Sequence, residues 1–363
     1  MKKKIFYLIL VLFLVLNCCA CTNKKNQLTN VNEFELTKAT KVVEGYLNSY
    51  MANDYTSMNY MYSKGFKKKV ENQNKPYLKI VGYKITDSTE MGLKANIKVN
   101  VVSTDTNSPY TSTDAYTFKI KKEKGNYTID DISSSNEKEV FLYKRSLLVK
   151  IKDEPMSNVL VNLRGIPEYY FEKTDVANVN KVRVAKDSFN NLSLSYSADN
   201  VAVSTAGANP FVGVCGITDL QQSTGDGGQG QNQGQGNNVS ENDIDPSKVA
   251  AKSITAIDVY AGSKVEAMVF SRDEKLLAVQ IAKAGNSTIN VYNIETGKVL
   301  SKEIEKTFPK DEVDLKIVRA DEEDFLIEST PKAKYKNDNS VKKIVGRWEW
   351  NIKDYKIKKE KAK

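Results

Sequence analysis

The fold is decided by a stretch that reads Phe270-Ser271-Arg272-Asp273-Glu274-Lys275-Leu276-Leu277-Ala278-Val279. Polar turn residues separate the apolar run that starts at Leu276 from the apolar residue before Ser271, which is typical of two strands joined by a tight turn. After a short gap the sequence continues Ile289-Asn290-Val291-Tyr292-Asn293-Ile294-Glu295-Thr296-Gly297-Lys298-Val299-Leu300. A third strand, followed by a turn at Gly297, is therefore predicted.

Two weaker copies of this pattern flank it. The upstream copy reads Tyr196-Ser197-Ala198-Asp199-Asn200-Val201-Ala202-Val203 and then Val214-Cys215-Gly216-Ile217, with a turn that we expect to be two residues shorter. The downstream copy reads Ala320-Asp321-Glu322-Glu323-Asp324-Phe325-Leu326-Ile327 and then Glu349-Trp350-Asn351-Ile352. The pattern resembles the WD- and Tol-type repeats of β-propellers, in which a Trp-Asp or similar pair ends the third strand; Tyr292-Asn293 stands in that place here. The resemblance implies a mainly-β, propeller-like domain over residues 177–357.

Three copies are fewer than the four to eight blades that close a propeller. Either residues 137–180 supply a hidden fourth blade, or the region is an open, propeller-like β-array; a sandwich-like arrangement is a further possibility. We favour the open array, and we interpret residues 137–176 as a connector. Residues 221–238 contain 12 Gln or Gly among 18, a composition that does not form a core, so a disordered insertion is predicted over 221–248. Residues 358–363 are interpreted as a basic tail.

The N-terminal part shows a different pattern. Apolar residues at Ala39, Val42, Val43, Tyr46, Leu47 and Tyr50 lie on one face of a helix, preceded by a possible capping box at Asn32 and Glu35. Asp54 is positioned to cap a second helix. Farther on, the period changes to two, as in half-buried antiparallel strands, and the parity change at Val81-Gly82 indicates a β-bulge. This order predicts an α+β domain over residues 31–136.

Two motifs in this domain resemble the cone-shaped, nuclear transport factor 2-like α+β family. They are Tyr46-Leu47-x-x-Tyr50-Met51-x-Asn53-Asp54-Tyr55 and Gly125-Asn126-Tyr127-Thr128-Ile129-Asp130-Asp131-Ile132. The resemblance implies a bent sheet around a long helix, with a pocket between them. The acids considered for an isomerase-like base are Asp87, Asp114, Asp130 and Asp131, of which Asp130 is expected to point outward because it alternates with Ile129. The candidate lining residues are Tyr46, Tyr50, Tyr55, Tyr60 and Tyr62, although aromatic residues at helical spacing are more often core. No catalytic residue is assigned.

The chain begins with Lys2, Lys3 and Lys4, followed by an apolar run over residues 5–16 and then Asn17-Cys18-Cys19-Ala20-Cys21. This segment resembles a bacterial lipoprotein signal peptide (1–20), in which a small residue precedes the cysteine that receives the lipid. Cys21 fits best because it follows Ala20, and Cys19 is the alternative because Leu16 stands three residues before it. Residues 21–30 would then form a tether. An uncleaved signal anchor is a further alternative, and each interpretation places the body at the extracytoplasmic face of the cell membrane.

Composition limits the chemistry. The chain has no histidine, which excludes Ser-His-Asp and Cys-His machinery and histidine metal sites. Cys215 is the only cysteine after Cys21, so no disulfide within the body is possible. We predict no metal, no cofactor and no nucleic-acid partner. The leading hypothesis is a non-enzymatic binding or scaffold lipoprotein whose partner is an envelope protein or a cell-wall polymer. The alternative is a small-molecule sensor, or a carboxylate-dependent isomerase or hydratase, that uses the N-terminal pocket. A transporter's solute-binding lipoprotein fits less well.

Overall fold

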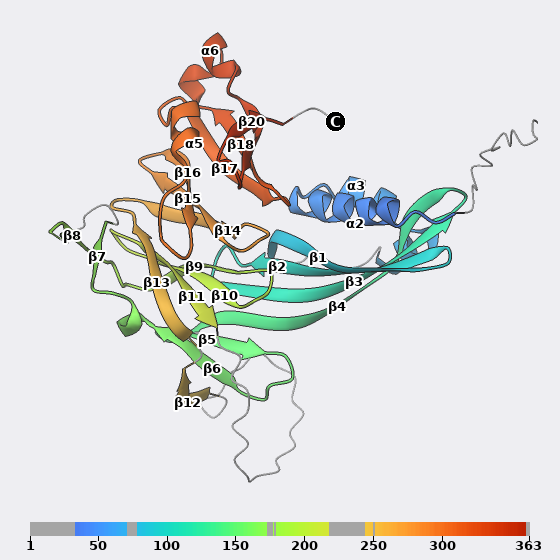
Figure 1. Cartoon of the computed structure of the whole chain (residues 1–363), viewed down its shortest axis with the longest axis horizontal. Coiled ribbons are helices and arrows are strands. Elements are labelled where there is room, and N and C mark those ends of the chain that lie inside the picture. Colours follow the sequence, from blue (N-terminus) through green and yellow to red (C-terminus); the bar gives the residue numbers. More distant parts are fainter. Residues whose placement is uncertain are drawn as a thin grey trace, which may run out of the picture.

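The structure is a computed structural model that describes residues 33–70, 78–172, 177, 179–217, 244–249 and 251–360 (Figure 1). Its N-terminal part begins with three helices: α2 (Leu36–Met51), α3 (Tyr55–Met61) and α4 (Lys64–Val70). Asp54 caps α3, as predicted, because its carboxylate accepts a hydrogen bond from the Ser57 backbone N–H at 3.0 Å. Glu35 precedes α2 without a side-chain cap, and Asn32 of the predicted capping box lies outside the described residues.

One long sheet follows the helices. Its strands are β1 (Lys79–Met91), β2 (Lys94–Thr104), β3 (Tyr110–Glu123), β4 (Asn126–Tyr143), β5 (Ser146–Ile151) and β6 (Ser157–Asn162), with β12 (Ile244–Val249) at the edge. Successive strands from β1 to β6 pair antiparallel, whereas β12 runs parallel to β6. The register of β1 shifts between Ile80 and Gly82, which confirms the predicted bulge.

The long sheet crosses the predicted domain boundary. Strand β4 continues from residue 126 to residue 143 without a break, and β5 and β6 extend the same sheet. Residues 137–162 of the predicted connector therefore belong to the sheet: Val140, Leu147 and Val149 are completely buried, and this buried apolar surface holds them there. A separate α+β domain that ends at residue 136 is not confirmed. Residues 244–248 of the predicted insertion belong to β12, and residues 218–243 lie outside the described part.

Besides a two-stranded ribbon, three smaller antiparallel sheets make up most of the rest of the described residues. The first contains β9 (Phe189–Leu194), β10 (Asn200–Thr205), β11 (Phe211–Ile217) and β13 (Ala251–Val259); the second contains β14 (Lys264–Phe270), β15 (Leu276–Lys283) and β16 (Asn286–Asn293); the third contains β17 (Val313–Ala320), β18 (Asp324–Pro331), β19 (Gly346–Asn351) and β20 (Ile357–Lys359). Each sheet holds one of the three predicted sequence copies. Lys358 and Lys359 of the predicted basic tail lie in β20, which pairs with β19.

The strand registers show that the copies are structurally equivalent. Val201 pairs with Cys215, Leu277 with Tyr292, and Phe325 with Trp350. Cys215, Tyr292 and Trp350, which hold the Trp-Asp position of the repeat, are all completely buried. The internal repeat is therefore confirmed, with Tyr292 at the position equivalent to Cys215 and Trp350.

The turn lengths correct one detail of the prediction. Leu194 pairs with Val201, and Phe270 pairs with Leu277, so the first two turns have the same length. Ala320 pairs with Phe325, which makes the third turn two residues shorter. The prediction placed the short turn in the first copy because Tyr196-Ser197 was aligned with Phe270-Ser271; in the structure Ser195 is the counterpart of Ser271. Both serine Oγ atoms accept a hydrogen bond from the backbone N–H five residues later.

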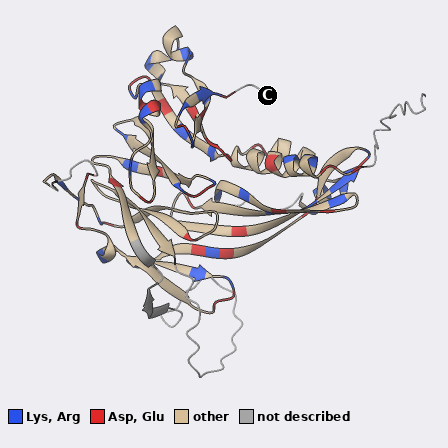
Figure 2. Ribbon diagram, viewed as in Figure 1, with Lys and Arg blue, Asp and Glu red and all other residues tan. Residues whose placement is uncertain are grey.

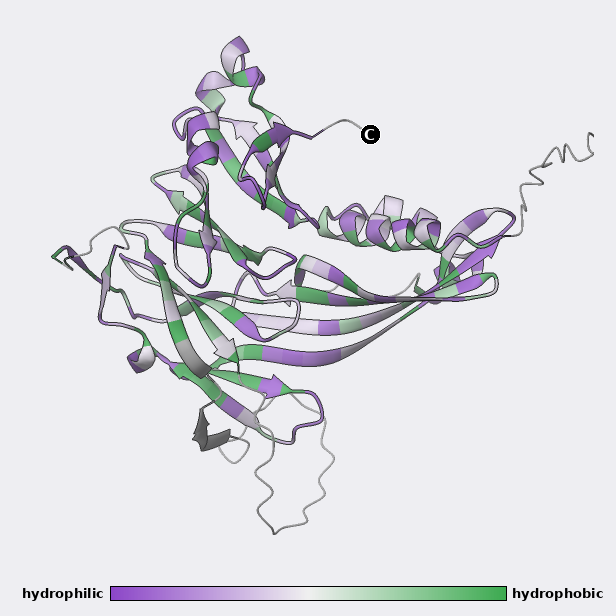
Figure 3. Cartoon of the chain, viewed as in Figure 1, coloured by the Kyte–Doolittle hydropathy of each residue, from purple (hydrophilic) through white to green (hydrophobic). Residues whose placement is uncertain are grey.

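The sheets pack face to face around shared cores, and hydrophobic residues gather on the strands where they meet (Figure 3). In β15, Leu277 and Val279 belong to the core shared with the first sheet, whereas Leu276 and Ala278 belong to the core shared with the third. This alternation follows from the two-residue period of a strand. The C-terminal part is thus mainly β and propeller-like, made of successive antiparallel sheets.

The long sheet contacts both the first and the third small sheets, and so lies where a further blade would close a propeller. Strand β9 contacts β2, β3, β4 and β14, and β17 contacts β14 and β1. Residues 137–180 supply the end of β4, all of β5 and β6, and β7 (Tyr169–Phe171), which pairs only with β8 (Lys181–Arg183) among the described strands. They do not form a hidden fourth blade. The remaining short helices, η1 (Leu163–Gly165), α5 (Lys302–Thr307), η3 (Ala333–Tyr335) and α6 (Asn339–Lys342), lie in the connections.

Candidate functional site

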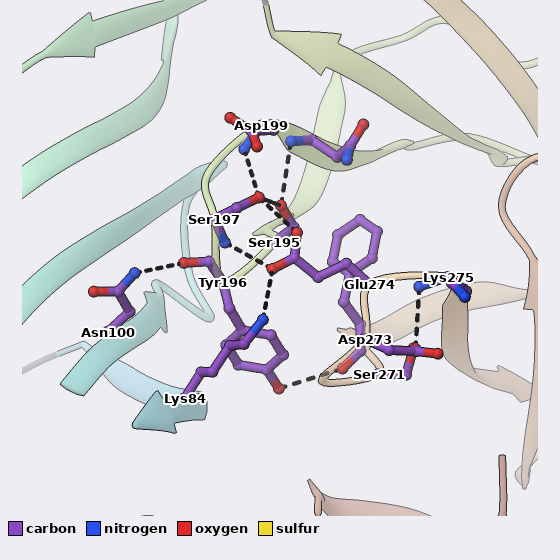
Figure 4. A network of polar contacts seen from close by, with 12 residues as sticks. Lys84, Asn100, Ser195, Tyr196, Ser197, Asp199, Ser271, Asp273, Glu274 and Lys275 are labelled. Atoms are coloured by element: carbon purple, nitrogen blue, oxygen red, sulfur yellow. Dashed lines mark hydrogen bonds and ion pairs between the residues drawn. The ribbon is translucent and has the colours of Figure 1, made fainter. Parts of the chain in front are cut away.

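The turns of the first two small sheets meet in a polar junction (Figure 4). The Glu274 carboxylate accepts hydrogen bonds from the backbone N–H of Ser197 at 2.8 Å and from its hydroxyl at 2.6 Å. The Tyr196 hydroxyl donates to the carbonyl oxygen of Phe270 at 3.3 Å. Each turn therefore satisfies polar groups of its neighbour, which fixes the two sheets relative to each other.

The long sheet takes part in the same junction. The Asn100 side-chain amide donates to the carbonyl oxygen of Tyr196 at 2.9 Å, and the Lys84 ammonium lies 3.9 Å from Glu274. The ring of Tyr196 lies directly over Gly82 at the bulge of β1, where a Cβ atom would meet the tyrosine hydroxyl at 2.4 Å. The glycine is therefore needed for this close approach.

Arg272 connects the junction to the third sheet. Its guanidinium is buried, donates to the Ala320 carbonyl at 3.2 Å and to the Glu322 carboxylate at 3.0 Å, and lies 4.5 Å from the centre of the Tyr83 ring. One side chain thus joins the long sheet and the second and third small sheets through an ion pair and a cation–π contact. Sequence reasoning identified the turn but not this role, because the partners of Arg272 are far away in the sequence.

A second polar cluster lies between the first two small sheets. The Tyr292 hydroxyl donates to the Asp258 carboxylate at 2.6 Å and lies 2.6 Å from the Tyr260 hydroxyl. The Asn290 side-chain amide donates to the same Tyr292 hydroxyl at 3.1 Å. Burial raises the pKa of Asp258 above its ordinary value, because desolvation penalises the carboxylate. This cluster was not predicted, although an aspartate within the apolar run of β13 was a usable signal. The geometry of the cluster fits a structural role, in which buried hydrogen bonds hold the two sheets together.

A polar groove of about 370 Å³ separates the second and third small sheets. Its lining includes three carboxylates and one ammonium group: Glu266, Asp314, Glu328 and Lys316. Two hydrogen bonds hold the Gln280 side chain in the groove. Its amide nitrogen donates to the Glu266 carboxylate at 2.8 Å, and its amide oxygen accepts from the Ile317 backbone N–H at 3.0 Å. The Lys332 ammonium lies 3.7 Å from Asp314 and the Arg347 guanidinium 3.9 Å from Glu328, so most of these charges are paired. The groove is therefore suited to a polar partner that offers complementary charges and hydrogen bonds.

The predicted N-terminal pocket is filled by side chains. The ring centre of Tyr46 lies 5.5 Å from that of Phe118 and 5.7 Å from that of Tyr62, and the Tyr62 hydroxyl donates to that of Tyr46 at 3.2 Å. Burial raises the pKa of Tyr46 far above its ordinary range. These tyrosines therefore form core rather than line a pocket, and Tyr60, with 79% of its surface exposed, faces away from it.

The predicted acids do not converge on this space either. Asp87, Asp130 and Asp131 form ion pairs with Lys98, Lys121 and Lys119 respectively. The ion pairs hold the pKa of Asp130 and of Asp131 below the usual range. Asp114 accepts hydrogen bonds from Ser112 and Asn136, each at 3.0 Å, and burial raises its pKa. The arrangement needed by the isomerase or hydratase alternative is therefore not brought together.

A smaller cavity of about 230 Å³ lies at the end of α2, where Tyr50 and Tyr55 meet the start of β1. Its other lining residues are Met51, Asn53, Leu78, Lys79, Ile80 and Thr106. None of the lining residues is a carboxylic acid, so this cavity does not supply the general base that the alternative requires.

The cysteines fall into two groups. Cys21 and the alternative Cys19 lie outside the described residues, so lipidation stays a prediction. Cys215 is buried in β11 and free, and burial raises the pKa of its thiol to about 12, which makes it an unreactive core residue. Within the described residues, no group of three or more acidic or cysteine side chains is placed to hold a metal ion. None of the helices that the structure describes is long and apolar enough to cross a bilayer.

Comparisons with known proteins give only distant similarities. No family model matches the chain, and no curated protein matches it. Among solved structures, the chain is similar to TolB from Acinetobacter baumannii (10% identity, TM-score 0.32), covering 69% of this chain and 55% of TolB. It is also similar to a putative 6-phosphogluconolactonase from Bacteroides uniformis (10% identity, TM-score 0.30, 74% and 81% covered).

A third similar structure is the β-propeller domain of Cps50 (Swd1) from Myceliophteria thermophila, with 9% identity, a TM-score of 0.25, and 66% and 77% of the two chains covered. The chain thus spans about half the length of TolB and most of the other two proteins. Identities and TM-scores this low carry no argument about activity, and the propeller-like description rests on the sheets themselves.

Proposed function

We propose that this chain is an extracytoplasmic lipoprotein, held at the cell membrane through a lipid on Cys21, whose folded body binds a partner in the cell envelope. Cys19 is the alternative lipid acceptor. The anchor is supported by the sequence of residues 1–21, in which three lysines, an apolar run and an Ala-Cys pair follow one another. The partner is an envelope protein or a cell-wall polymer. The likeness of α2 and the curved strands β1 to β3 to a nuclear transport factor 2-like cone remains an interpretation within this proposal.

The observation that carries the binding role is the groove between the second and third small sheets. Ser287 bridges the two sheets because its backbone N–H donates to the Asp314 carboxylate at 2.9 Å and its hydroxyl donates to the Leu315 carbonyl at 2.9 Å. The sheets that form its walls are also fixed by Arg272 at the junction. A preorganised polar surface of this kind loses little conformational entropy when a partner binds.

Lipidation is tested by metabolic labelling with radioactive palmitate in a bacterial host. The Cys21→Ser variant is expected to lose the label and to leave the membrane fraction, while Cys19→Ser keeps both. Loss of label only in Cys19→Ser would move the acceptor to Cys19. Label in neither the wild type nor the variants would refute the anchor.

Partner binding is tested by crosslinking in native membranes, followed by mass spectrometry. Glu328→Lys reverses a charge on the rim of the groove, and its only described ion pair, with Arg347, is long at 3.9 Å. We expect this variant to lose the partner that the wild type captures. The matched control is Glu295→Lys, which alters an exposed acid outside the groove lining. Capture that is equal in both variants would remove the groove from the proposal.

A further inference from the structure

The chain enters the folded body at one end of the long sheet. Lys122 donates to the Glu33 carbonyl oxygen at 2.5 Å, and the backbone N–H of Glu35 donates to the Tyr127 hydroxyl at 2.6 Å. Phe34 packs edge-on against the Tyr127 ring, with 5.1 Å between ring centres. The first described residues are thus fixed beside the hairpin that joins β3 to β4.

Two apolar side chains protrude at the same end. Met91 and Leu93 flank Gly92 at the tip of the hairpin that joins β1 to β2, and each leaves 51% of its surface exposed. Gly92 has a φ of +64°, which allows the tight turn. These two residues are among the few large hydrophobic side chains that the described part of the chain exposes to this degree.

Lysines surround this tip. Within the described residues, several of them form no ion pair with an acid: Lys94 beside Leu93, Lys122 and Lys124 on the neighbouring hairpin, and Lys64, Lys67, Lys68 and Lys69 on α4, which packs against β4. Basic residues gather at this end of the sheet in Figure 2. Of the acids at this end, Asp130 and Glu123 pair with Lys121, and Asp131 pairs with Lys119. Glu90, beside Met91, is exposed, but the lysines outnumber the acids.

The geometry points to a membrane-contact surface formed by Met91, Leu93, Lys94, Lys122 and Lys124, which docks onto the anionic head groups of a lipid bilayer. We call it the hairpin surface. This inference rests on the proposed lipid anchor. If Cys21 carries the lipid, the 12 residues from Cys21 to Glu33 span at most about 40 Å, so the anchor confines this end of the body, and not the far sheets, to the neighbourhood of the bilayer.

The hairpin surface has an apolar tip with lysines around it, and these two parts complement the acyl chains and the anionic head groups of such a bilayer. Lysine ammonium groups interact with anionic head groups, and each contributes about a fivefold gain in partitioning near the surface. The Met91 and Leu93 side chains reach the boundary of the acyl chains, where their transfer from water is favourable. An anionic polymer would also attract the lysines, but it offers no apolar layer for the tip.

The test measures sedimentation of the protein with lipid vesicles. It uses the chain from residue 22 onward, which lacks the lipid and the apolar run but keeps every described residue. We expect binding to vesicles that contain phosphatidylglycerol, weaker binding as salt is raised, and little binding to phosphatidylcholine alone. Equal binding to both kinds of vesicle would refute the inference.

Matched variants locate the surface. Lys94→Gln combined with Lys124→Gln should weaken binding about 25-fold, whereas Lys298→Gln combined with Lys336→Gln, two exposed lysines near β16 and η3, should leave it unchanged. Met91→Ser combined with Leu93→Ser should weaken binding about tenfold, and the control Val179→Ser, at a residue 73% exposed, should not. An equal loss in test and control variants would overturn the assignment.

Two further outcomes separate the alternatives. Binding that depends on the lysines but not on Met91 and Leu93 would assign the surface to a soluble anionic polymer and refute membrane docking. A dimer that disappears in the Met91→Ser, Leu93→Ser variant would assign the tip to a second copy of the chain. Because the protein in this assay carries no lipid, its result is independent of palmitate labelling, so the anchor and the hairpin surface can fail separately.

Discussion

Gly82→Ala should destabilise the protein, because the Tyr196 ring occupies the space that a side chain would need. A Cβ atom at this position would lie 2.4 Å from the Tyr196 hydroxyl oxygen, 2.9 Å from Cε1 and 3.0 Å from Cζ. The ring has little freedom to move, since only 2% of its surface is exposed and its hydroxyl donates to the Phe270 carbonyl. The substitution must therefore shift either the ring or strand β1.

Three contributions set the expected change in the free energy of unfolding of Gly82→Ala. Overpacking of a close-packed interior costs about 1–3 kcal/mol, and weakening the Tyr196 hydrogen bond costs about 1 kcal/mol more. Loss of glycine's freedom in the unfolded chain returns about 0.4–1 kcal/mol. The free energy of unfolding should thus fall by about 1–3.5 kcal/mol. Urea titration followed by tyrosine and tryptophan fluorescence measures this fall as a lower midpoint with an unchanged slope.

Gly216→Ala provides the matched control. Gly216 lies in strand β11, and a Cβ atom there would meet nothing closer than the Asn200 side-chain oxygen at 3.8 Å. This variant should be as stable as the wild type or slightly more stable. Adding Tyr196→Phe to Gly82→Ala removes the closest contact, so the two effects should not add, with a coupling of about 1 kcal/mol. If Gly82→Ala behaves like Gly216→Ala, the role assigned to the junction is refuted.

Three other substitutions or treatments test the remaining contacts. Arg272→Met should lower the free energy of unfolding by about 2–4 kcal/mol in urea titration, since it removes the bonds to the third sheet and the contact with Tyr83. Burial raises the folded-state pKa of Asp258, so its contribution to stability is present in acid and is lost as the pH rises above the ordinary pKa of a carboxyl, about 4. Asp258→Asn should therefore gain stability relative to wild type as the pH rises above this value, and a pH-independent difference would contradict this. Native Cys215 should resist iodoacetamide, because burial raises its thiol pKa to about 12, and should react at the rate of unfolding in urea; rapid alkylation of the native protein, measured by mass, would show that the site is open.

Local chemistry could be predicted from the sequence where the determining groups are close together in the chain. The Asp54 cap needs only the backbone three residues ahead, and the bulge at Gly82 appears as a change in the parity of apolar residues. The three repeat copies were recognisable for the same reason, since each strand pair and its turn lie within a short segment. Tyr60 was misassigned because helical spacing within one short helix does not show which face meets the sheet.

The continuity of the long sheet could not be predicted. Between residues 133 and 137 strand β4 is polar on both faces, as in Ser133, Ser134, Ser135 and Asn136, and resembles a linker. It is held in place by backbone pairing with β3, for example between Ser135 and Ala115, and backbone pairing leaves no trace in side-chain polarity. A sequence pattern reports burial, so a strand with two polar faces is invisible to it.

The contacts of the junction could not be predicted because they join residues that are far apart in the sequence. Tyr196 and Phe270 are separated by 74 residues, and Asn100 and Tyr196 by 96, so these contacts exist only after three sheets have formed. Their effect is to join the small sheets rigidly to one end of the long sheet, while the chain enters at the other end (Figure 1). Strand β4, with 18 residues, is about 60 Å long. Docked through the hairpin surface, the long sheet would therefore act as a spacer that holds the groove of Glu328 away from the bilayer, where an envelope partner can reach it.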